Sequence, residues 1–214
     1  MFVVYFQLLI HIKKILKPFK GGALLIILDK LRSFGYNISF NLYNAANYGA
    51  PQTRERVILI GKLNGNKLPY LQPTHSNDIK FKLKPWHTLQ DAFSSLNQYE
   101  HHYIEFPEKR LKYYKMLTEG QYWKHLPLNE QKEAMGKAYY LGGGKTGFYK
   151  KIIIIQTFSD ISNNPTMPAT DLCHPICNRP LSIEEYKAIQ GFPTDWKICG
   201  PILEQYKQLV TLFQ

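Results

Sequence analysis

The segment from residue 23 to residue 61 constrains the fold most strongly, because three patterned stretches follow one another within it. Leucine and isoleucine recur at spacings of three and four over residues 23–34, which predicts an amphipathic helix. Residues 38–43 and 57–61 are rich in β-forming side chains, and a polar loop containing glycine and proline separates them, residues 44–52. The sequence therefore predicts an antiparallel hairpin, with the helix packed on the sheet that contains it.

A second helix is specified near the end of the chain. Ser182 and Glu185 stand three residues apart, the spacing of a capping box, so a helix should begin at Ser182 and run to Gln190. Gly191 then supplies the left-handed residue that ends a helix. Residues 202–213 form a last amphipathic stretch.

Charge and composition narrow the class of protein. The chain has 214 residues, 44% of them hydrophobic, and 27 Lys+Arg against 16 Asp+Glu give a net charge of +11. This composition excludes a disordered basic tail, and the positive charge favours an anionic partner such as nucleic acid, although a basic surface kept for solubility would give the same total. Residues 101–151 contain ten Lys+Arg, five Asp+Glu and seven tyrosines. Both a basic, aromatic binding surface and a solvated basic face over a tyrosine-rich core fit that segment.

The three cysteines, Cys173, Cys177 and Cys199, show no disulfide framework, which indicates a reducing cytoplasm. Cys173 and Cys177 have no second pair of ligands at the spacing that zinc needs, so we predict no metal site. Residues 1–10 are apolar but too short to span a membrane, and their lysines follow them, which excludes a signal peptide. A helix on a membrane surface is kept as an alternative for that stretch.

Three glycines precede Lys145, but Tyr139 stands where a phosphate-binding loop requires another glycine, so we reject that motif. The glycines would let the backbone approach a phosphate closely, and a flexible turn explains them equally well.

Residues 44–61 read Asn-Ala-Ala-Asn-Tyr-Gly-Ala-Pro-Gln-Thr-Arg-Glu-Arg-Val-Ile-Leu-Ile-Gly. This segment resembles the eighth motif of DNA (cytosine-5) methyltransferases, in which a Tyr-Gly-x-Pro-Gln loop leads through Arg-x-Arg into a strand. The matching residues are Tyr48, Gly49, Pro51, Gln52, Arg54 and Arg56. Arg54 and Arg56, two apart on a strand, should point the same way.

Residues 178–193 resemble the ninth motif of the same family. The residues that match its helix are Ser182, Glu185, Gln190, Gly191, Phe192 and Pro193. In the family these two motifs bracket a target-recognition domain. Residues 145–149 and 165–170 are similar to recognition segments of some bacterial members.

The resemblance implies an α/β fold, namely the C-terminal remnant of a Rossmann-like methyltransferase domain with an inserted, irregular α+β target-recognition domain. The divisions that follow are 1–19, an atypical segment; 20–73, strands and helix of the catalytic domain; 74–178, the target-recognition domain; and 179–214, a return to the catalytic domain with an abnormal C-terminus.

The resemblance also implies a chemistry. Members of the family flip a cytosine out of the duplex and transfer a methyl group to it from S-adenosylmethionine. Arg54 and Arg56 would hold the flipped base and stabilise its developing charge, with Arg56 the preferred base contact. The predicted DNA contacts are Lys145, Thr146, Tyr149 and Arg179. The expected setting is a restriction-modification system in a bacterial cytoplasm, with double-stranded DNA as partner and no membrane.

The chain departs from the family pattern in what it lacks. It contains no Phe-x-Gly-x-Gly cofactor loop, no Pro-Cys-Gln and no Glu-Asn-Val. We therefore expect a C-terminal fragment from a split or frameshifted gene, inactive alone, with a complementary N-terminal methyltransferase chain as a partner. The alternatives are a non-catalytic basic DNA-binding module and, on charge alone, an RNA- or membrane-surface protein.

Overall fold

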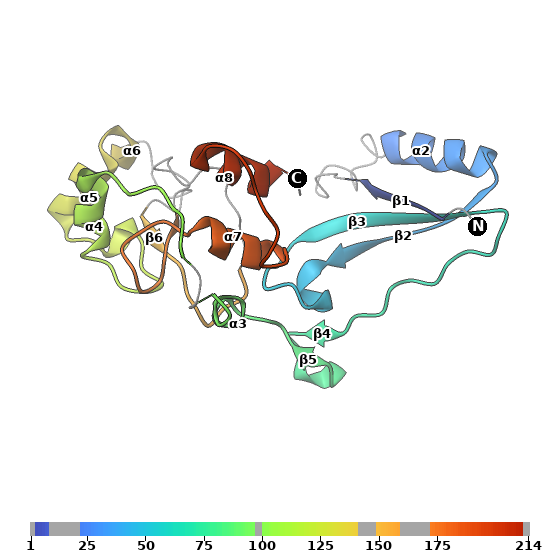
Figure 1. Cartoon of the computed structure of the whole chain (residues 1–214), viewed down its shortest axis with the longest axis horizontal. Coiled ribbons are helices and arrows are strands. Elements are labelled where there is room, and N and C mark those ends of the chain that lie inside the picture. The colour runs from blue at the N-terminus through green and yellow to red at the C-terminus, as the bar shows by residue number, and fades with distance from the viewer. Residues whose placement is uncertain (1–2, 9–21, 97–99, 141–148, 159–171, 212–214) are drawn as a thin grey trace. The chain divides into compact units, whose positions relative to one another are not determined.

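The computed structural model forms two compact units. The residues that it describes are 3–8, 22–96, 100–140, 149–158 and 172–211 (Figure 1). The first unit comprises residues 1–49 and 53–86, and the second comprises residues 50–52 and 87–214. Each unit is built around cores of its own.

A three-stranded sheet forms the centre of the first unit (Figure 1). Its strands are β1 (Val3–Leu8), β2 (Tyr36–Asn44) and β3 (Glu55–Leu63). β3 lies in the middle and runs antiparallel to both neighbours, so the predicted hairpin of β2 and β3 is confirmed. β1 overturns the membrane-surface helix considered for the N-terminus, because pairing with β3 gives these apolar residues a strand conformation.

Helix α2 (Gly22–Ser33) packs on one face of this sheet, as the apolar spacing predicts. Leu28 meets Ile38 and Leu59 in a small core, where each side chain is at most 7% exposed. Gly35 follows the helix with a φ of 86°, a left-handed conformation that glycine adopts without strain, and β2 begins at the next residue.

Short elements complete the first unit. They are the 3-10 helices η1 (Ala45–Tyr48) and η2 (Ile79–Phe81) and the strands β4 (His75–Ser76) and β5 (Lys84–Pro85). β4 and β5 pair in parallel, so the chain between them forms a closed loop.

The second unit is mainly helical, with one short strand pair. Its elements are α3 (Leu89–Phe93), α4 (Glu108–Tyr114), η3 (Trp123–His125), α5 (Leu128–Met135), α6 (Lys137–Tyr140), β6 (Lys150–Lys151), β7 (Leu172–Cys173), α7 (Ile183–Gln190) and α8 (Ile202–Thr211). α7 and α8 confirm the two helices predicted near the end of the chain. Across the described residues, the helices fall short of the length and apolar character that crossing a membrane would require.

Two cores lie within the second unit. The larger one joins α3, α7 and α8 and includes Leu89, Ile189 and Leu209. The other is aromatic and contains Tyr113 and Tyr114, both fully buried. These buried rings favour a tyrosine-rich core over an aromatic surface for this part of residues 101–151.

Candidate functional site

The turn formed by η1 is fixed at both ends. The Asn44 side chain accepts a hydrogen bond from the Ala46 N–H at 3.1 Å, and Gly49 ends the turn with a φ of 91°. A Cβ on Gly49 would lie 3.1 Å from Cε1 of His75. The positive φ would strain any other residue at this position, and a Cβ would also require the His75 ring to shift by a few tenths of an ångström, so glycine is favoured here.

Tyr48 ties this turn to the chain that leaves the sheet. Its hydroxyl donates to the Leu71 carbonyl at 3.1 Å, and its ring meets the buried Tyr43 ring edge-on at 5.8 Å. Burial raises the pKa of Tyr48, and the charge of Tyr43 adds to the shift. The hydroxyl therefore stays protonated and available as a donor at neutral pH.

Arg54 and Arg56 follow this turn. The Ala45 N–H donates to the Arg54 carbonyl at 2.9 Å, and Nη1 of Arg56 donates to the Glu55 carbonyl at 2.8 Å. β3 begins at Glu55, so the prediction that both arginines lie on one strand is wrong: Arg54 precedes the strand. The pairing of Ala45 with Arg54 holds the backbone there instead.

The two guanidinium groups are only partly hydrated. Burial lowers the pKa of Arg54 to about 10, and the positive charge of Arg56 contributes to that shift. Burial also lowers the pKa of Arg56. Both remain charged at neutral pH, and a polar or anionic group bound between them would relieve their repulsion. The first unit thus carries two partly buried guanidinium groups directly after the turn of η1.

Residues 50–52, which include Pro51 and Gln52, belong to the second unit, although the chain on either side of them belongs to the first. Nε2 of Gln52 donates to the Ile189 carbonyl and to Oε1 of Gln190, each at 3.1 Å. The Phe158 N–H donates to the Pro51 carbonyl at 2.9 Å. The two motif segments, 137 residues apart, therefore meet through the side chain of Gln52.

The N-terminus of α7 carries the predicted capping box. The Glu185 N–H donates to Oγ of Ser182 at 3.1 Å, and the Ser182 N–H donates to Oε2 of Glu185 at 2.8 Å. Both residues are almost completely buried, and Gly191 ends the helix with a φ of 76°. The helix boundaries inferred from the sequence are confirmed.

Glu185 also anchors a buried ion pair. Arg179 donates to both of its carboxylate oxygens, at 2.9 and 2.6 Å, while the guanidinium lies 4.9 Å from the centre of the Tyr103 ring. Such a bidentate pair fixes both partners. The structure thus gives Arg179 an internal role, and its predicted contact with DNA stays a prediction.

His174 completes this buried network. Its Nδ1 accepts the N–H groups of Ile176 at 3.2 Å and Cys177 at 3.0 Å, and its Nε2 lies 3.4 Å from Oε1 of Glu185. Burial lowers the pKa of His174 to about 4, against the opposing charge of Glu185. The ring is therefore neutral at pH 7, with its proton on Nε2. We did not predict this structural role of His174 from the sequence. The sequence marks the residue only by its position between Cys173 and Cys177.

Ser182, His101 and Glu185 superficially resemble a catalytic triad. Oγ of Ser182 lies 2.9 Å from Nδ1 of His101, and the same Nδ1 lies 3.6 Å from Oε1 of Glu185. One nitrogen facing both groups cannot relay a proton between them, and Ser182 is fully buried with its oxygen engaged in the helix cap. The arrangement stabilises the fold.

The other predicted residues lie apart from the arginine pair or outside the described ranges. Tyr149 is 5% exposed and packs in the aromatic core against Tyr113 and Tyr114, so its contact with DNA stays a prediction. Lys145 and Thr146 lie outside the described residues. Within the described ranges, no group of three or more His, Cys, Asp or Glu side chains could hold a metal ion.

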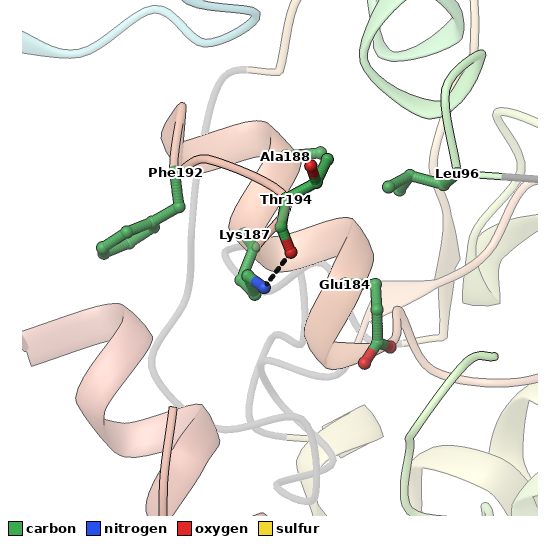
Figure 2. Close-up of a pocket in the computed structure, with 6 residues that line it drawn as sticks. All are labelled: Leu96, Glu184, Lys187, Ala188, Phe192 and Thr194. Carbon is green, nitrogen blue, oxygen red and sulfur yellow. Dashed lines mark hydrogen bonds between the residues drawn. The ribbon is translucent and has the colours of Figure 1, made fainter. Parts of the chain in front are cut away.

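Phe192 lines a small hollow of about 30 Å³ beside α7 (Figure 2). The hollow is lined by Leu96, Glu184, Lys187, Ala188, Phe192 and Thr194. Nζ of Lys187 donates to the Thr194 carbonyl at 2.9 Å, and Glu184 accepts two hydrogen bonds from His102. Its charged groups are therefore already engaged, and its volume falls below that of ordinary ligand pockets.

Comparison with known proteins gives a clear assignment. The sequence model of the C-5 cytosine-specific DNA methylase family matches residues 11–210. The type II methyltransferase M.PspPI of Psychrobacter is 34% identical over 88% of this chain and 46% of its own length. M.Eco47II of Escherichia coli is 31% identical over 93% of this chain and 48% of its own length. The chain thus spans about half the length of these relatives.

The fold agrees with the sequence comparison. A crystal structure described as a prophage-encoded DNA modification methyltransferase of Escherichia coli superposes with a TM-score of 0.53, covering 91% of this chain and 61% of that one at 15% identity. The chain therefore carries part of an α/β, Rossmann-like methyltransferase fold. With the family model matched over most of its length, the chain belongs to the C-5 cytosine-specific DNA methylases.

Proposed function

We propose that this chain is the C-terminal portion of a DNA (cytosine-5-)-methyltransferase of a bacterial restriction-modification system, which binds duplex DNA and holds the flipped cytosine. The observation that carries the proposal is the pair of partly buried arginines, Arg54 and Arg56, which follow a turn that ends in the left-handed Gly49. In this assignment residues 20–73 and 179–214 belong to the catalytic domain, and residues 74–178 to the target-recognition domain.

The arginines act by electrostatic stabilisation. Negative charge develops on the cytosine ring as a nucleophile adds to it, and guanidinium groups already in place need no reorganisation to stabilise that charge. Arg56 lies on β3 whereas Arg54 precedes that strand, and we assign the contact with the base to Arg56. The partial burial of both side chains strengthens the interaction, because water screens it less.

In this proposal the nucleophile and the main cofactor-binding loop come from another polypeptide. The cysteines of this chain follow Leu172, Ile176 and Ile198, so none of them stands in a Pro-Cys-Gln motif. The hollow beside α7 does not fit S-adenosylmethionine, since it is too small and its one carboxylate already binds His102. A second hollow, in the first unit, is lined by Arg32 and Lys67, and none of the described residues around it offers a carboxylate that could bind the ribose hydroxyls. We therefore propose that the chain is inactive alone and works with an N-terminal methyltransferase polypeptide.

Complementation tests this proposal. The purified chain is mixed with the part of M.PspPI that it does not match, and transfer of a labelled methyl group to duplex DNA is measured. We expect incorporation from the mixture and none from either polypeptide alone. Incorporation by this chain alone would refute the fragment assignment. The measurement is repeated with the corresponding part of M.Eco47II, because a poor fit between this chain and the M.PspPI part would also abolish methyl transfer.

A non-catalytic DNA-binding module is the second candidate, which the net charge of +11 favours. It predicts binding to duplex DNA together with no methyl transfer in any mixture. The same experiment therefore separates the two functions.

A further inference from the structure

The loop between β4 and β5 exposes apolar and basic side chains in strict alternation. We call residues 78–84 the basic loop. Its apolar side chains are Ile79, Phe81 and Leu83, which are 93%, 66% and 38% exposed. Its basic side chains are Lys80, Lys82 and Lys84, all exposed. Clustered apolar side chains that remain in water commonly mark a surface that binds something.

The backbone of the basic loop has a defined conformation, although its side chains are exposed. Oδ1 of Asp78 accepts the Lys80 N–H at 2.9 Å, and the Asp78 N–H donates to Oγ of Ser76 at 3.0 Å. The Lys82 N–H donates to the Ile79 carbonyl at 3.0 Å, which closes the turn of η2. The backbone of the basic loop is therefore specified by its own hydrogen bonds, while its side chains point into solvent.

The base of the loop rests on the turn that leads to the arginine pair. Both ends of the segment bind Asn47 in η1: the Thr74 N–H donates to its carbonyl, and Nε1 of Trp86 donates to its Oδ1, each at 2.9 Å. The buried His75 ring lies against Gly49 in the same turn. The basic loop and Arg54 are thus held by one short piece of backbone within the first unit.

The charges of the loop are uncompensated. Among the described residues, none of its three lysines forms an ion pair with a carboxylate. The one acid in the loop, Asp78, already caps η2. Three exposed ammonium groups within five residues concentrate positive charge that attracts phosphates, and the exposed apolar side chains beside them can pack against deoxyribose.

We propose that the basic loop is a second DNA-contacting element, which grips the sugar-phosphate backbone beside the flipped cytosine. The inference rests on the proposed function, because duplex DNA is the anionic polymer that this family acts on. It adds a contact outside the motif residues: Lys80 and Lys84 bind phosphates, and Phe81 packs against the sugars between them.

Binding of the full chain to a fluorescent duplex, followed by anisotropy between about 50 and 200 mM salt, tests the inference. In the double variant Lys80→Gln/Lys84→Gln, the slope of log Kd against log salt should become shallower by about two, since each phosphate contact contributes about 0.9. Lys82 is left unchanged because it has a φ of 54°. Phe81→Ser should weaken binding several-fold without changing the slope.

The matched control removes the same charge at the other end of the sheet. Arg32 and Lys67 line a hollow with Tyr36 at the start of β2, roughly 25 Å along the strand from η1. Arg32→Gln/Lys67→Gln should leave the slope close to that of the wild type. Equal slopes in both double variants would overturn the inference, whether both are reduced or both unchanged.

The wild-type measurement separates this inference from the proposed function. Absence of salt-dependent binding by the wild-type chain would refute DNA binding itself, and the inference with it. Wild-type binding with an unaltered slope in Lys80→Gln/Lys84→Gln would refute the inference alone. If Phe81→Ser changes the oligomeric state in gel filtration but not DNA binding, the loop binds a second copy of the chain, and the inference is wrong.

Discussion

Removing two neighbouring arginine side chains partly from water costs folding free energy. A protein that keeps such a pair usually needs it for something other than stability. Burial and mutual repulsion both depress the pKa of Arg54, so this site is unfavourable for stability and suited to binding. The hydrogen bonds around Gly49 and Ala45 hold the backbone in place against that cost. At the scale of single residues, the arginine pair is therefore the feature on which the proposed function rests.

Arg56→Ala in a complemented enzyme should lower turnover far more than DNA affinity. An arginine that contacts the flipped base acts as charge develops, and its loss should cost roughly 3 kcal/mol of transition-state stabilisation, as for one oxyanion-type donor. Lys145→Ala should do the reverse, raising Kd and leaving turnover intact. Single-turnover methylation and anisotropy give the two quantities. Equal effects of both substitutions on binding, with turnover intact, would show that Arg56 is a backbone clamp.

His174 should make stability depend on pH. Its pKa falls from 6.5 to about 4 on folding, so the unfolded chain binds the proton more tightly. The contribution of neutral His174 is fully present above pH 6.5 and is lost as the pH falls towards 4, by roughly 3 kcal/mol. Urea unfolding at pH 7 and pH 4.5 should show this loss in the wild type, and a smaller one in His174→Gln. Parallel pH profiles for the two proteins would mean that His174 does not titrate in this window.

At the scale of elements, α7 depends on its N-terminal cap. Ser182→Ala should destabilise the second unit by about 1 to 2 kcal/mol, because it removes the acceptor of the Glu185 N–H in a fully buried position. Ser94→Ala is the control, since that exposed hydroxyl donates to the Asp91 carbonyl at the end of α3. Thermal unfolding of both variants would measure the difference. A similar change in Tm for the two would argue against the cap.

The helices and strands that the sequence predicted correctly are specified by residues that lie close together in the sequence. α2 begins one residue before the predicted helix, and the capping box of α7 lies where the spacing of Ser182 and Glu185 places it. β2 and β3 were recognisable because a turn with Gly49 separates two β-forming runs. In each case the signal and the structure it specifies lie within a few residues of each other.

The features that escaped prediction depend on distant partners. β1 is a strand because β3, some fifty residues on, offers it an edge. His101, His174 and Arg179 gather around Glu185 from segments up to 84 residues away, and no local pattern encodes that meeting. The motif arginines were found by resemblance to a family, whereas their burial and the departure of Arg54 from the strand required the structure.

At the scale of the whole molecule, the described cores differ greatly in size. Among the residues whose side chains the structure describes, the first unit buries six apolar residues, three of which, Leu28, Ile38 and Leu59, form its core, while the larger core of the second unit alone has twelve. Since buried apolar area supplies most of the folding free energy, the first unit should be the less stable. We therefore predict unfolding in two steps, with the first unit melting first.

Tryptophan fluorescence in urea would test this order. Trp86 reports on the first unit, and Trp123→Phe/Trp196→Phe removes the other two tryptophans. Leu59→Ala should move the early transition by about 2 to 5 kcal/mol and leave the late one in place. Ile189→Ala, in the second unit, should do the opposite. A single transition that both substitutions shift equally would show that the units unfold together.

The attachment of Gln52 to α7 has a consequence for how such proteins can be recombined. Residues 50–52 pack with the second unit, while the chain on either side packs with the first. A crossover placed at residue 86 would therefore transplant the second unit without the glutamine that binds the end of α7. A chimera that takes its second unit from another relative should be built with a second junction, so that residues 50–52 are exchanged together with that unit.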